Sequence, residues 1–160
     1  MRILKLFLFV SILANLQFGC SSDDNSQPFN STITIDSIVY EPKQISFYTI
    51  NSSIEKSVVF ILKKNLNTPM DLDEMVFRIN YPLTQSDASG TYQLNGYQAV
   101  GNYTKGSTSY NFFNGSFLIE DLGNEKYNIT FQNVKGNPGN GSTEVITVLG
   151  NLNGTFQFNN

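Results

Sequence analysis

Residues 75–81 read Met-Val-Phe-Arg-Ile-Asn-Tyr, so that a large apolar side chain returns at every second position. A two-residue period places alternate side chains on opposite faces of a β-strand, with one face buried and the other wet. Residues 127–131 (Tyr-Asn-Ile-Thr-Phe) repeat this pattern. Residues 58–62 (Val-Val-Phe-Ile-Leu) are apolar throughout, which predicts a central strand covered on both faces. Because no segment shows a sustained apolar repeat at helical spacing, the chain is predicted to be all-β.

Turn residues separate the predicted strands. Asn95-Gly96, Asn114-Gly115 and Asn153-Gly154 are each expected to be tight hairpin turns, and Gly123-Asn124 to be another. At Asp36-Ser37 the alternation changes phase, which predicts a bulge or kink. About ten short strands follow from this reading, and strands that are neighbours in sequence should pair antiparallel. The predicted fold is an antiparallel β-sandwich or a meandering β-barrel, between which the periodicity does not choose.

Composition excludes several function classes. The chain has 160 residues, one cysteine and no histidine. Without histidine, neither a Ser-His-Asp triad nor a Cys-His pair can form, and the commonest metal ligand is missing. Arg2 and Lys5 lie in a segment that is predicted to be removed, which leaves 8 basic and 13 acidic side chains and a net charge of −5. A weakly acidic surface argues against a nucleic-acid partner.

The N-terminus has the pattern of a signal peptide. A basic start is followed by an almost wholly apolar run over residues 6–14, and Gly19 precedes Cys20. The apolar run is too short to span a bilayer as a helix. Residues 1–19 are therefore predicted to be a lipoprotein signal peptide, cut before Cys20. Gln17 and Phe18 depart from the usual residues before a lipidated cysteine, so an ordinary signal peptide or a buried strand stays open.

Cys20 is followed by a short acidic stretch: Ser21, Ser22, Asp23 and Asp24. This arrangement resembles surface-exposed lipoproteins of flavobacteria and other Bacteroidetes. The resemblance implies a fatty-acylated Cys20, residues 20–31 as a flexible tether, and an anchored protein on the outer face of the outer membrane. If the two aspartates are only a solvated linker, the protein faces the periplasm instead.

Residues 32–160 are predicted to form one domain. Its strand and turn segments, such as residues 114–119 (Asn-Gly-Ser-Phe-Leu-Ile) and 127–131, resemble the small β-rich lipoproteins of unknown function in Bacteroidetes. That resemblance implies a fold type and no activity.

Two sequence patterns suggest modification. Asp36-Ser37-Ile38 matches the Asp-Ser/Thr-apolar motif of O-glycosylation in Bacteroidetes, which implies Ser37 as an acceptor unless the match is chance. Seven Asn-X-Ser/Thr triplets also occur, and we interpret them as a result of abundant asparagine. They begin at Asn30, Asn51, Asn102, Asn114, Asn128, Asn140 and Asn153.

Four tyrosines recur in a stretch rich in glycine, asparagine, threonine and serine: Tyr92, Tyr97, Tyr103 and Tyr110. Aromatic rings beside amide side chains can stack on and hydrogen-bond sugars, so these residues are candidate ligand contacts. Cross-strand aromatic pairing in the core is the alternative. The acidic run Asp71-Leu72-Asp73-Glu74 is expected to be a solvated turn, since Val76 and Pro82 stand where a calcium loop needs glycine and glutamate.

The sequence therefore favours a non-enzymatic, membrane-anchored binding or structural module, an accessory to glycan capture or adhesion. Its expected partners are the membrane, through the lipid, and a glycan or an envelope protein. We expect no cofactor and no metal. A lipocalin-like carrier of a small apolar ligand and a carboxylate-based glycoside hydrolase are the alternatives.

Overall fold

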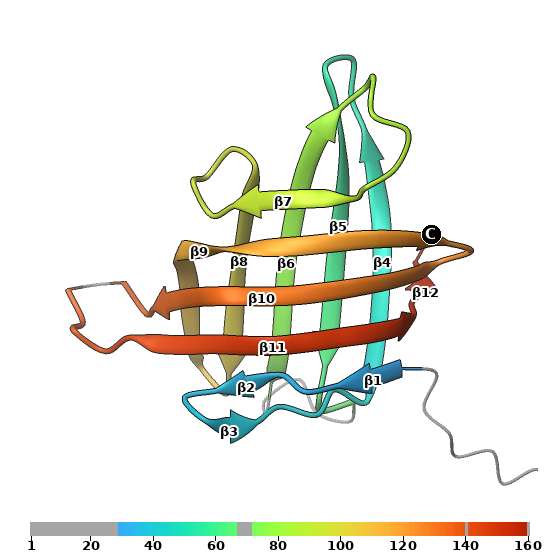
Figure 1. Ribbon diagram of the computed structural model, residues 1–160. Coiled ribbons are helices and arrows are strands. Elements are labelled where there is room, and N and C mark those ends of the chain that lie inside the picture. Colours follow the sequence, from blue (N-terminus) through green and yellow to red (C-terminus); the bar gives the residue numbers. More distant parts are fainter. Residues whose placement is uncertain (1–28, 67–71, 140, 160) are drawn as a thin grey trace, which may run out of the picture.

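The computed structural model describes residues 29–66, 72–139 and 141–159. These residues form twelve strands and contain no helix, which confirms the all-β prediction (Figure 1). The predicted signal peptide, Cys20 and the export signal lie outside the described residues.

The strands are β1 (Phe29–Ser31), β2 (Thr34–Ile35), β3 (Ile38–Val39), β4 (Gln44–Asn51), β5 (Glu55–Lys63), β6 (Asp73–Pro82), β7 (Gly90–Gln93), β8 (Ala99–Lys105), β9 (Thr108–Gly123), β10 (Lys126–Asn137), β11 (Ile146–Thr155) and β12 (Gln157–Phe158).

All twelve strands belong to one curled, open sheet. Ten of them follow the order β12-β4-β5-β6-β8-β9-β10-β11-β2-β3, while β1 pairs with β11 and β7 pairs with β9. The pairs are antiparallel as expected, except that β12 runs parallel to β4. In Figure 1, β9, β10 and β11 run across β4, β5, β6 and β8 in front of them. The sheet thus folds back over itself and encloses its core.

The prediction of a hairpin turn at Asn114-Gly115 is wrong, because this dipeptide lies inside the sixteen-residue strand β9. The first part of β9 pairs with β8 and the later part pairs with β7, along the same edge. Gly115 has a φ of 98°, and a Cβ there would lie 2.5 Å from the carbonyl oxygen of Asn133. Asn-Gly therefore serves to bend the strand against β10, at a register shift, and does not reverse the chain.

The other predicted turns have different outcomes. A turn does join the paired strands β9 and β10 near Gly123-Asn124, but its two residues are Asn124 and Glu125, with φ of 51° and 63°, and Gly123 ends β9. Asn95-Gly96 lies between β7 and β8, which do not pair with each other, and Asn153-Gly154 lies within β11. Asp36-Ser37 forms a two-residue hairpin turn between β2 and β3, with φ of 50° and 68°, in place of the expected bulge or kink.

The enclosed core is aromatic. Phe77 stacks on Phe117 with ring centroids 4.5 Å apart and on Phe60 at 5.1 Å. Phe131 and Phe156 pack edge-on against this row and are fully buried. The central strand predicted for residues 58–62 is β5, which lies between β4 and β6.

The folded domain begins earlier than expected. Phe29–Ser31 were assigned to the tether, but they form β1 and pair with residues 152–154 of β11. The partly buried Phe29 packs against the core, because its apolar side chain gains by leaving water. Residues 29–31 thus belong to the folded domain and not to the predicted tether.

Candidate functional site

Two of the four predicted tyrosines meet in space. Tyr103 on β8 lies opposite Tyr110 on β9, and their rings are nearly parallel with centroids 6.2 Å apart. Tyr40 meets Tyr103 edge-on at 5.7 Å. These three rings border a pocket of about 230 Å³, here called the tyrosine pocket. Its remaining lining residues are Ile35, Asp36, Ile38, Val39, Lys64, Asp73, Lys105, Glu144 and Ile146.

In the tyrosine pocket, the tyrosine hydroxyl groups already bind carboxylates of the protein itself. Tyr40 and Tyr103 are only 2% and 5% exposed, so their ring faces are covered. The hydroxyl of Tyr103 donates to Asp73 Oδ1 at 2.9 Å, and that of Tyr110 donates to Glu144 Oε1 at 2.8 Å. Burial, followed by the hydrogen bond to Asp73, raises the pKa of Tyr103 well above its ordinary value. Tyr103 is therefore part of the interior packing, and the partly buried Tyr110 packs against it.

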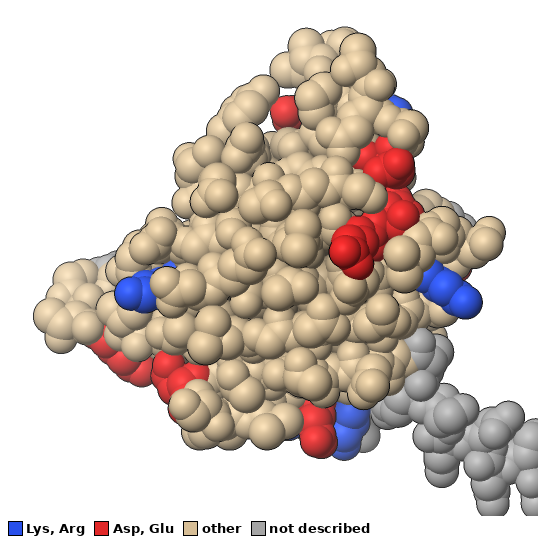
Figure 2. Space-filling view, viewed as in Figure 1, with Lys and Arg blue, Asp and Glu red and all other residues tan. Residues whose placement is uncertain are grey.

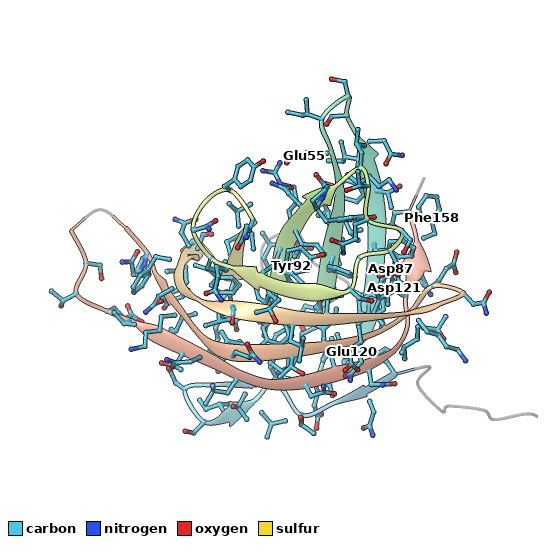
Figure 3. The ribbon with its side chains drawn as sticks, turned by 45° about the horizontal axis from the view of Figure 1, so that its top comes forward. Glu55, Asp87, Tyr92, Glu120, Asp121 and Phe158 are labelled. Carbon is cyan, nitrogen blue, oxygen red and sulfur yellow. The ribbon has the colours of Figure 1, made fainter. Side chains whose placement is uncertain are left out.

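The other two predicted tyrosines lie elsewhere. Tyr92 is buried on β7, and its hydroxyl donates to the carbonyl oxygen of Ala88 at 2.9 Å (Figure 3). Tyr97 is 70% exposed in the segment between β7 and β8. The four side chains thus do not form one site.

Acidic side chains gather on the face that Figure 2 turns to the reader, where Figure 3 places Asp87, Glu120 and Asp121. Each carboxylate already accepts hydrogen bonds. Asp87 accepts from the Ser89 amide at 2.9 Å, which lowers the pKa of Asp87. Asp121 accepts from the amides of Gly123 and Ala88, and Glu120 accepts from the Asn128 side chain at 2.6 Å. These hydrogen bonds attach the loop before β7 to β9 and join side chains on the outer faces of β9 and β10.

The acidic run at residues 71–74 is partly described. Asp71 lies outside the described residues. Asp73 and Glu74 begin β6, where Asp73 accepts the Tyr103 hydroxyl and Glu74 lies 3.5 Å from Lys63 Nζ. Within the described part of the chain, no cluster of three or more acidic or cysteine side chains is arranged to hold a metal ion.

The modification motifs occupy defined positions. Ser37 is exposed at the tip of the β2–β3 turn, accessible from solvent. Asn30, Asn153 and Asn128 lie side by side on β1, β11 and β10, in register with Glu120. Strand alternation turns Asn128 outward between the buried Tyr127 and Ile129, with Thr130 on the same face. The triplet at Asn128 thus follows from outward-facing polar positions spaced two apart.

A second groove, which the sequence reasoning missed, crosses the outer surface of β4, β5, β6 and β8. We call it the outer groove; its volume is about 400 Å³. Its lining residues are Tyr48, Ile50, Val59, Val76, Phe77, Arg78, Val100, Gly101, Asn102 and Asn111. The side chain of Phe77 points into the core and Gly101 has none, so both contribute backbone to the floor.

The strand register defines the two walls of the outer groove. Tyr48, Val59, Arg78 and Val100 lie opposite one another on successive strands and form one wall. Two residues further along the strands, Val76, Asn102 and Asn111 form the other. Neighbouring strands lie about 4.8 Å apart, so the groove runs roughly 15 Å or more across the sheet.

The outer groove has an aromatic and apolar end, a central guanidinium and an amide end. Tyr48, Ile50 and Val59 make the apolar end, and Val59 is only 4% exposed although it faces outward. At the amide end, Asn102 Nδ2 donates to Thr104 Oγ1 at 3.0 Å and to Ser109 Oγ at 3.2 Å, which orients that side chain.

Arg78 stands out among the lining residues of the outer groove. It is the only charged one, and its Nε is buried with no hydrogen-bond partner among the described residues. A buried donor without a partner costs free energy, on the order of 1–3 kcal/mol. The only local signal in the sequence was an arginine at an outward position of a strand, which ordinarily indicates a solvated face.

Neither a protein-family model, a curated protein nor a solved structure matches the chain. Within its described part, no helix is long and apolar enough to cross a membrane.

Proposed function

We propose that this protein is a non-enzymatic binding module that holds a glycan in the outer groove. The observation that carries the proposal is the combination of a tyrosine ring, a guanidinium and two amides along one open groove. Sugar rings present apolar faces that stack on aromatic rings, and hydroxyl groups that amides and guanidinium groups bind. An elongated, shallow groove suits several units of a chain better than one small molecule, which usually occupies an enclosed pocket.

The two alternative functions have weaker support. A carrier of a small apolar ligand needs an internal cavity, yet the space inside the curled sheet holds packed phenylalanine rings, including Phe60, Phe77 and Phe117. A carboxylate-based hydrolase needs paired acids beside its substrate. No carboxylate lines the outer groove. In the tyrosine pocket, Asp73 and Glu144 each accept a tyrosine hydroxyl, and Asp36 accepts from the Thr147 amide at 2.8 Å.

For the finer form of the fold we propose a barrel-like closure. β11 lies near one end of the strand order and β12 at the other, yet only Phe156 separates them in sequence. The segment from Ile146 to Phe158 therefore passes from one end of the sheet to the other, and this supports a barrel over a sandwich.

We further propose that the domain is held at the outer face of the outer membrane by a lipid on Cys20. The support is the sequence pattern of residues 1–24. Residues 20–28, nine residues in all, would reach about 30 Å if extended. Mass spectrometry of the native protein should find an acylated N-terminal cysteine. Protease treatment of whole cells should release the domain, and should fail to do so after Asp23→Ala and Asp24→Ala.

Glycan-array binding by the full-length chain in a non-ionic detergent tests the binding function. We expect binding to a defined set of glycans that Tyr48→Ala and Asn111→Ala each weaken at least tenfold. Tyr97→Ala is the matched control, because that tyrosine is 70% exposed outside the groove. Absence of binding to any glycan would refute the proposed function, and binding that depends on Tyr97 instead would refute the site.

A further inference from the structure

We propose that the glycan unit at the centre of the outer groove carries a carboxylate, as in a uronic acid, and that Arg78 binds this group. The inference rests on the proposed function and names the substrate class of the same site. Its starting point is the position of Arg78, whose cross-strand neighbours are Val59 on β5 and Val100 on β8. A positive charge between two apolar side chains lacks an anionic partner in the sheet.

The outer face supplies no counter-charge at this place. None of the residues lining the groove is acidic. Glu55 lies on the outward face of β5, four residues from Val59, the neighbour of Arg78. Glu74 lies on the same face of β6, four residues along the strand, so both carboxylates are about 13 Å away along their strands. Glu74 is also 3.5 Å from Lys63 Nζ, with which it forms an ion pair. The guanidinium is therefore available to an external anion.

The geometry of the guanidinium favours a carboxylate. Arginine offers its N–H donors in a planar fork that matches the two oxygens of a carboxylate, and such charge-assisted bonds are about twice as strong as neutral ones. Because Nε of Arg78 is buried, the two Nη groups are the donors that a ligand in the groove can reach, and none of their hydrogen bonds is taken by the described residues. Together they present the end of the fork to the two oxygens of a carboxylate.

The charge of the site suits a singly charged group. Arg78 is the only cation along the groove and balances a single negative charge. A carboxylated sugar has one charge per unit and keeps the apolar ring face that Tyr48 can stack on.

The other lining residues complete the recognition. With the carboxylate at Arg78, one neighbouring unit lies towards Tyr48 and Ile50, and the next lies towards Asn102 and Asn111. The amide of Asn102 is already oriented by Thr104 and Ser109, which limits the entropy lost when it binds a hydroxyl group.

Calorimetry on the full-length chain in a non-ionic detergent tests the inference. The probes are oligosaccharides of galacturonate, glucuronate and mannuronate, each compared with its carboxyl-reduced neutral form and with a sulfated neutral oligosaccharide. We expect one uronate to bind on the order of tenfold to a hundredfold more tightly than its reduced form. Arg78→Gln should abolish this preference, and Arg78→Lys should retain only part of it. Lys126→Gln, which removes a charge from an exposed site, should leave it unchanged.

The outcomes separate the inference from the proposed function. Equal binding of charged and neutral forms, a preference for the sulfated form, or a uronate preference that survives Arg78→Gln would overturn the inference while glycan binding stands. No binding of any oligosaccharide in this panel or on the array would overturn both. Thermal melting of each variant shows that a loss of preference does not come from unfolding.

Discussion

Replacing Arg78 by methionine should make the protein more stable and remove the uronate preference. The buried Nε of Arg78 has no partner, and an unsatisfied buried donor costs about 1–3 kcal/mol. Methionine has a similar length and an adaptable apolar side chain, so it can fill the space between Val59 and Val100. Because the outer part of the guanidinium is hydrated in the wild type, we expect a net gain near the lower limit, about 1 kcal/mol.

Thermal unfolding of the full-length chain in detergent measures this gain. For a domain of this size, 1 kcal/mol corresponds to an increase in Tm of roughly 3–5 °C. Lys126→Met is the matched control, since it removes the same charge from an exposed position and should change stability by less than about 0.5 kcal/mol. A decrease in Tm for Arg78→Met, or an equal increase in both variants, would refute the reasoning that an unsatisfied donor is held at the groove for binding.

Three further predictions concern the fold. Gly115→Ala should lower the free energy of unfolding in urea by about 2–4 kcal/mol, because φ is 98° and the new Cβ would lie 2.5 Å from the Asn133 carbonyl oxygen. The control is Gly106→Asn, at φ 58° in open space, which should lower the same free energy by less than about 1 kcal/mol. Equal effects of the two substitutions would contradict the steric argument. Tyr103→Phe should cost about 1–2 kcal/mol by the same assay, because Asp73 loses a hydrogen bond of 2.9 Å, while Tyr97→Phe should change nothing measurable. Burial raises the pKa of Tyr40, Tyr103 and Tyr127 above the ordinary 10.0. The stability that these neutral phenols contribute is therefore complete below pH 10 and is lost as the pH rises through their folded-state pKa values. If tyrosinate absorbance showed that all eight tyrosines ionise near pH 10 in the folded protein, this prediction would be contradicted.

The strands were largely predictable because their signals are local. In β6 and β10, alternate residues are buried as the two-residue period predicts, and Phe77, Ile129 and Phe131 lie in the core. The turn between β9 and β10 was predictable to within one residue, since a short reversal depends mainly on the residues near it.

The same Asn-Gly dipeptide takes a different place in the fold depending on which strands pack against it. Asn95-Gly96, Asn114-Gly115 and Asn153-Gly154 all predict hairpins, but the second bends β9 and the third continues β11. At Gly115, the backbone of Asn133 on β10 approaches so closely that a side chain would not fit. The positive φ that glycine permits is needed there for strand crossing, and the sequence has no local sign of that.

The candidate site was the least predictable part. Of the candidate tyrosines, Tyr103 is buried in the packing, and Tyr48, which lines the outer groove, was not among the candidates. Arg78 looked like an ordinary solvated residue, because its significance depends on Val59 and Val100, which lie on other strands.

The sequence by itself determined the β class, the aromatic core and the face on which each strand residue lies, since these depend on alternation along a few consecutive residues. Only the tertiary structure decided which strands pair, where β9 bends, and that an arginine lies between two valines in the outer groove. Strand register joins residues that are far apart in the chain, and their contacts stabilise one pairing among many that the same alternation would allow.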